Sequence, residues 1–95
     1  MYTVIHESPW GKETSSLCDD LEGAKARLTI LAIRALHYNG ITNRTFATKE
    51  GEYIYRDCFT IDPIKIVTTN TSFTLSYTGY VEHIYIKESE VVDDW

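Results

Sequence analysis

The chain has 95 residues, of which 43% are hydrophobic and 24% are charged, and its formal net charge is −5. This length suits one globular domain, so we expect residues 1–95 to form a single domain, and the composition excludes an intrinsically disordered chain. The negative charge argues against direct binding to nucleic acid or to anionic membranes, because both require a basic surface.

The first two segments predict a strand followed by a loop. Residues 2–6 alternate with β-branched side chains, which is typical of a strand. Residues 7–16 contain proline, glycine and several hydroxyl side chains, and this composition indicates a loop. Trp10 lies in the middle of that loop, where a tryptophan more often packs over the edge of the core and less often anchors a partner.

The clearest predicted element is a helix at about residues 17–38. Its apolar residues recur at steps of three and four, which places them on one face. They are Leu17, Leu21, Ala24, Leu28, Leu31 and Ala35. Ser16 and Asp19 are both candidates for the N-cap, because each has an acidic residue three positions later. Asn39-Gly40 supplies the expected C-cap.

The second half of the chain predicts strands separated by short turns. The expected strands are residues 45–48, 52–56, 64–69, 72–77 and 80–87, and residues 88–95 form an acidic tail. A run of strands after a single helix indicates an α+β fold in the order β-α-β-β-β-β. We expect the helix to pack on one face of a mostly antiparallel sheet of five to six strands.

No motif for catalysis, a cofactor or a metal ion occurs in the sequence. Cys18 and Cys58 are too few for a disulfide framework, and the three histidines are isolated from one another. We therefore expect no cofactor, no metal and no catalytic residue. The alternative is a small enzyme with a thiol or carboxylate site, in which Cys58 or Asp57 would share a pocket with a histidine. The chain shows no secretory signal and no apolar run long enough to cross a membrane.

The layout of the sequence carries one resemblance. A short N-terminal strand precedes a helix that opens with Asp-Asp-Leu-Glu-Gly-Ala-Lys at residues 19–25, and a β-meander ends with Ile-Tyr-Ile-Lys at residues 84–87. This layout resembles small phage-encoded accessory proteins, including anti-CRISPR inhibitors. The resemblance implies a non-enzymatic protein in the cytoplasm of a host bacterium. Such a protein would inhibit a host protein or a ribonucleoprotein defence complex by covering its surface or by mimicking nucleic acid with its carboxylates.

The expected binding surface is the sheet face that the single helix leaves open. Exposed tyrosines on that face would anchor a partner, and nearby carboxylates would pair with its basic groups. The predicted partner-binding residues are Tyr53, Tyr55, Tyr85, Glu50, Glu52, Glu88, Glu90, Asp93 and Asp94. A second alternative is a structural module that buries the open face in a homodimer.

Overall fold

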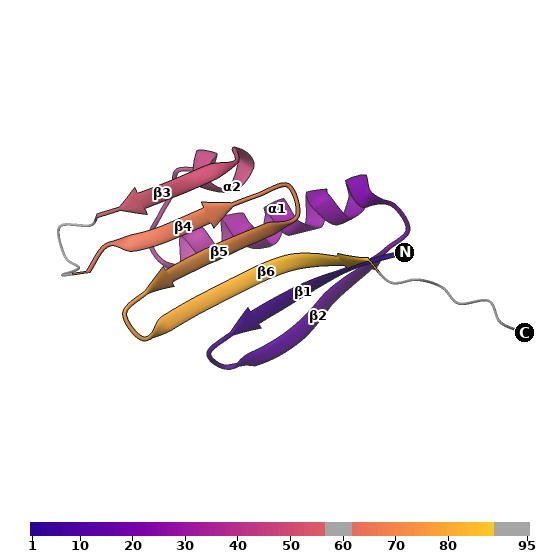
Figure 1. Ribbon diagram of the computed structural model, residues 1–95, viewed down its shortest axis with the longest axis horizontal. Coiled ribbons are helices and arrows are strands. Elements are labelled where there is room, and N and C mark those ends of the chain that lie inside the picture. The colour runs from indigo at the N-terminus through magenta and orange to yellow at the C-terminus, as the bar shows by residue number, and fades with distance from the viewer. Residues whose placement is uncertain (57–61, 89–95) are drawn as a thin grey trace, which may run out of the picture.

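A computed structural model describes residues 1–56 and 62–88, without the side chains of Ser15 and Ser16. The fold is α+β, as predicted: a six-stranded antiparallel sheet carries one main helix on one face (Figure 1). Its elements are β1 (Tyr2–Ser8), β2 (Gly11–Cys18), α1 (Leu21–Tyr38), α2 (Thr45–Thr48), β3 (Gly51–Tyr55), β4 (Ile64–Thr68), β5 (Ser72–Tyr77) and β6 (Tyr80–Glu88).

The sheet has the strand order β2-β1-β6-β5-β4-β3. The first hairpin, β1–β2, therefore lies beside the last strand of the chain. In the β1–β6 pair, Ile5 lies opposite Tyr85 and His6 lies opposite Ile84. This pairing sets Tyr2 opposite Glu88, so the two ends of the described chain lie together at one end of strands β1 and β6 (Figure 1).

The prediction of a loop at residues 7–16 is wrong, because residues 11–18 form strand β2. The chain reverses at Pro9 and Trp10, where the Ser8 hydroxyl accepts a hydrogen bond from the Trp10 backbone amide at 3.3 Å. The backbone of β2 pairs with β1 on one side only, since β2 is an edge strand. Edge strands often carry exposed polar side chains, and Lys12 and Glu13 are such residues in β2. The strand therefore lacks the alternating hydrophobic pattern from which the other strands were predicted.

Helix α1 begins four residues later than predicted. Its N-cap is Asp20, whose carboxylate accepts a hydrogen bond from the Gly23 amide at 2.7 Å, so neither Ser16 nor Asp19 is the cap. Gly23 leaves room for this cap, because a Cβ there would lie only 2.9 Å from Asp20 Oδ1. The helix ends as predicted at Asn39, and Gly40 follows with a positive φ of 77°.

Residues 45–48 form the short helix α2 rather than the predicted strand. The side chain of Asn43 accepts a hydrogen bond from the Thr45 amide, and the Phe46 ring packs against the rings of Tyr53 and Tyr55. Threonine and phenylalanine favour strands in isolation, but these contacts hold the segment over the sheet.

The core lies between α1 and the sheet face that α1 covers. It is built from alternate residues of the strands and from the apolar face of the helix. Its buried members are Val4, Ala24, Leu28, Leu31, Ala32, Ala35, Leu36, Ile41, Ala47, Ile64, Ile66, Phe73, Leu75 and Ile84. Leu17, which was predicted to share this face, lies in β2 and is 65% exposed. No described helix covers the opposite face of the sheet (Figure 1).

Candidate functional site

Two of the predicted anchors, Tyr53 and Tyr55, do not lie on the open sheet face. They alternate along β3 with the exposed Glu52 and Ile54, and their rings pack against the core on the side of the helices. The Tyr53 hydroxyl donates a hydrogen bond to the backbone carbonyl of Lys49 at 2.6 Å. The prediction placed them wrongly because α2 shields this end of the sheet, beyond the reach of α1.

The third anchor, Tyr85, lies on the open face as predicted. Its ring stacks on that of His83 with 4.8 Å between centroids, and its hydroxyl donates a hydrogen bond to Glu7 at 3.0 Å. His83 Nδ1 in turn lies 2.7 Å from the Thr74 hydroxyl. Tyr85 therefore belongs to a side-chain network that ties β1, β5 and β6 together across the open face.

The predicted acidic residues do not form one cluster. Glu50 and Glu52 are exposed near the edge strand β3, whereas the exposed Glu88 ends β6, three strands away. Glu90, Asp93 and Asp94 lie outside the residues that the structure describes, as do Asp57 and Cys58. Cys18 is a free, partly buried thiol at the end of β2.

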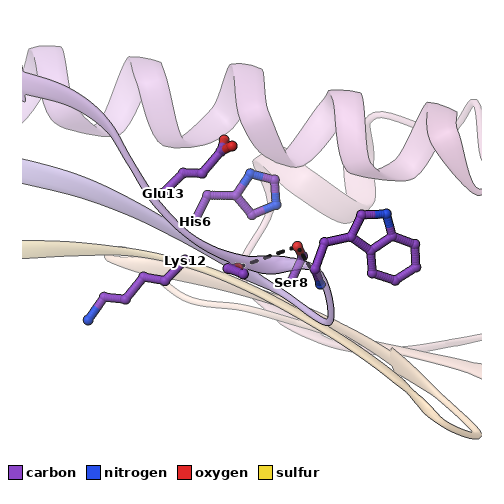
Figure 2. A pocket seen from close by; sticks show the side chains of 6 residues that line it. His6, Ser8, Lys12 and Glu13 are labelled. Atoms are coloured by element: carbon purple, nitrogen blue, oxygen red, sulfur yellow. Dashed lines mark hydrogen bonds between the residues drawn. The ribbon is translucent and has the colours of Figure 1, made fainter.

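A hollow lies between α1 and the β1–β2 hairpin, at a place that the sequence did not indicate. Three adjoining cavities of about 340, 270 and 240 Å³ share His6 as a lining residue, and we call them together the hairpin–helix groove. Figure 2 shows His6 and Glu13 pointing from the hairpin toward α1, whereas Lys12 points away.

Glu82 lines two of the three cavities of this groove and is only 5% exposed. Side chains alternate between the two faces along β6, so Glu82 lies on the same face as Tyr80 and Ile84, which pack on the helix side. One carboxylate oxygen lies 2.5 Å from His6 Nε2, and the other accepts a hydrogen bond from the Tyr80 hydroxyl at 2.7 Å. A buried carboxylate is costly without such partners, so the three side chains form one unit, the His6–Glu82–Tyr80 relay.

The electrostatics of the relay keep Tyr80 protonated. Burial is the main cause, and the hydrogen bond to Glu82 and the charge of that carboxylate add to it, so the pKa of the Tyr80 phenol is raised well above its ordinary value. Tyr80 thus remains a hydrogen-bond donor to Glu82 at neutral pH.

Aromatic side chains wall one end of the groove. Trp10 and Tyr38 are 77% and 79% exposed. The Trp10 ring meets Tyr80 edge-on at a centroid distance of 5.9 Å, and Tyr80 stacks on Tyr77 at 4.9 Å. The presence of Trp10 in a polar segment was the one sequence signal for this site.

The relay orients an imidazole, but the hydrogen bonds that the structure gives His6 within the described ranges include none to a serine, threonine or cysteine. Over the same ranges, no three histidine, cysteine or acidic side chains lie close enough together to hold a metal ion.

Comparison with known proteins adds no relationship from which a role could be transferred. No family model, curated protein or solved structure matches this chain. Within residues 1–56 and 62–88, no helix has the length and apolar character needed to cross a membrane.

Proposed function

We propose that this chain is a non-enzymatic binding protein that attaches to a partner protein through the hairpin–helix groove. The observation that carries the proposal is that Trp10 and Tyr38 are the two most exposed large hydrophobic side chains of the described residues, and both border the same groove. Tryptophan and tyrosine are the residues most enriched among those that dominate binding energy.

The groove also has the shape and chemistry of a protein-binding site. It is concave, the Trp10 ring in its wall contacts the Tyr80 ring, and its lining carries polar groups that can fix the orientation of a bound segment. A partner that covers Trp10 and Tyr38 would remove from water two apolar surfaces that the chain itself leaves exposed. Because Trp10 and Tyr38 are already exposed, binding of the partner requires no large change in the fold of this chain.

We extend the proposal to the biological class that the layout of the sequence resembles. On that basis the partner is a host protein or a ribonucleoprotein complex in the cytoplasm of a bacterium, and binding inhibits it by covering a working surface. The resemblance to phage-encoded inhibitors supports this part of the proposal, and the groove supports only the binding.

An affinity capture from bacterial lysate, with and without nuclease, tests the proposed function. We expect a stoichiometric protein partner that survives nuclease treatment, and we expect Trp10→Ala combined with Tyr38→Ala to weaken its binding at least ~30-fold, or about 2 kcal/mol. The matched control is Ile54→Ala, which removes an exposed apolar side chain from β3 on the open face.

Three results would contradict the proposal. Unchanged capture by the Trp10 and Tyr38 double variant would exclude the groove as the binding surface. Loss of capture in the Ile54 variant alone would move the site to the open face. A solution mass well above 10.9 kDa with no captured partner would favour the homodimeric module instead.

A further inference from the structure

The two edge strands of the sheet, β2 and β3, differ in how well they are protected from pairing with another strand (Figure 1). A bulge interrupts the pairing of β2 with β1, and β2 carries the charged Lys12 and Glu13. Bulges and charges are two of the means by which proteins protect an edge. Strand β3 pairs with β4 in unbroken register, and within the described ranges it pairs with no other strand. Its outer edge therefore offers backbone N–H and C=O groups to a further strand.

The exposed side chains along β3 form a self-complementary pattern. Glu52 and Ile54 are exposed, and Arg56, directly after the strand, continues the alternation with a third exposed side chain. Alternate residues share one face, so these three lie together on the open face of the sheet. Glu52 and Arg56 form no ion pair within the part of the chain that the structure describes, and Ile54 is 59% exposed.

Antiparallel pairing of two copies matches this pattern with itself. If Ile54 lies on the two-fold axis, it faces Ile54 of the second copy, and Glu52 faces Arg56 of the second copy on both sides of the axis. On the helix side the same register sets Tyr53 opposite Tyr55 of the second copy. Opposite charges and aromatic rings that face each other across a strand pair stabilise that pair. A two-fold interface requires a surface that complements itself, and residues 52–56 supply one.

We propose that β3 pairs antiparallel with β3 of a second copy of this chain and joins the two sheets into one. The inference goes beyond the proposed function, because β3 lies at the opposite edge of the sheet from the β1–β2 hairpin. The dimer therefore leaves both hairpin–helix grooves free. Because one short strand from each copy forms the contact, we expect a weak dimer with a dissociation constant on the order of 100 μM.

Sedimentation equilibrium over a concentration series tests the inference. We expect the mass to rise with concentration from 10.9 kDa toward twice that value. A chain that stays monomeric at concentrations up to about 1 mM, tenfold above the expected dissociation constant, would overturn the inference.

Charge reversal tests the register of the pairing. Glu52→Arg sets like charges opposite each other twice in the dimer and should weaken it at least ~10-fold, as should Arg56→Glu. The double variant, Glu52→Arg with Arg56→Glu, exchanges the two charges and should restore the dimer. These side chains are exposed, so the variants should fold.

Glu50→Arg is the matched control, because it makes the same change of charge at an exposed position outside residues 52–56. We expect it to change the dissociation constant less than ~2-fold, since Glu50 faces neither Glu52 nor Arg56 in the proposed register. Glu50 would face Arg56 of the second copy only in a register centred on Tyr53. Weakening by Glu50→Arg but not by Glu52→Arg, or a double variant that stays as weak as the single ones, would overturn the pairing.

The inference and the proposed function can fail separately. A monomeric chain that still captures a partner through the groove would remove only the pairing of β3. A dimer that responds to the charge exchange, together with capture that is unaffected by the Trp10 and Tyr38 double variant, would remove only the proposed function.

Discussion

Glu82 is the residue around which the hairpin–helix groove is organised. The alternation of side chains along β6 places Glu82 on the helix-covered face of the sheet. The next residue of β6 on that face is the fully buried Ile84. An unpaired carboxylate at such a position would cost several kcal/mol, and His6 and Tyr80 offset that cost with hydrogen bonds. The buried carboxyl group thereby becomes a fixed feature of the groove.

The raised pKa of Tyr80 predicts how stability depends on pH. Because the folded state favours the neutral phenol, the stabilisation is complete below the unfolded pKa of about 10 and is lost as pH rises above it. Tyr80→Phe should therefore lower the free energy of unfolding by about 1 kcal/mol at neutral pH, and the gap to the wild type should shrink above about pH 10. Urea unfolding at a series of pH values measures this gap.

The charge of Glu82 is one of the causes, so it provides a check. Glu82→Gln removes that charge, and the difference that Tyr80→Phe makes should then change less with pH. A gap between wild type and Tyr80→Phe that stays constant from neutral to alkaline pH would show that the relay does not hold the phenol neutral.

At the scale of the elements, the N-terminus of α1 depends on a single cap. Asp20→Ala removes the acceptor for the Gly23 amide and should destabilise the protein by about 1 kcal/mol, which lowers the Tm by roughly 4–8 °C in a domain of this size. Asp19→Ala is the matched control, because it removes the same charge from the adjacent position without removing the cap. Equal losses in the two variants, measured by thermal unfolding, would show that charge near the helix end and not the cap is responsible.

The elements also show which patterns could be predicted from sequence. The 3.6-residue period identified α1, and alternation together with turn signals identified β1, β3, β4, β5 and β6, because these elements bury one face. Strand β2 and helix α2 were missed for physical reasons. The first is a polar edge strand, and the second is held by tertiary contacts of Phe46 that local preference does not contain.

At the scale of the whole molecule, the groove exists because β6 pairs with β1. His6 and Glu82 are 76 positions apart in the sequence, and only this pairing brings them into contact. Neither residue stood out in the sequence, because an isolated histidine and an isolated glutamate in strands are ordinary surface residues. Trp10 did stand out, but Tyr38, which lines the same cavity, is the last residue of a helix and gave no signal.

The whole molecule also presents two different surfaces to a partner. On the open face of the sheet, Tyr85 is engaged with Glu7 and His83. The exposed apolar residues of that face, Leu17, Ile54 and Val81, lie in three different strands. On the helix side, Trp10 and Tyr38 are concentrated at one groove. We therefore expect a partner to approach the end of the molecule where the β1–β2 hairpin meets α1.

Site-specific photo-cross-linking in bacterial cells tests this central claim most directly. A photoreactive benzoylphenylalanine is placed at Trp10, at Tyr38 or at Ile54, and adducts are identified by mass spectrometry. The groove account predicts one shared protein adduct from positions 10 and 38 and no such adduct from position 54. An adduct from position 54 alone would contradict the account and place the binding surface on the open face of the sheet.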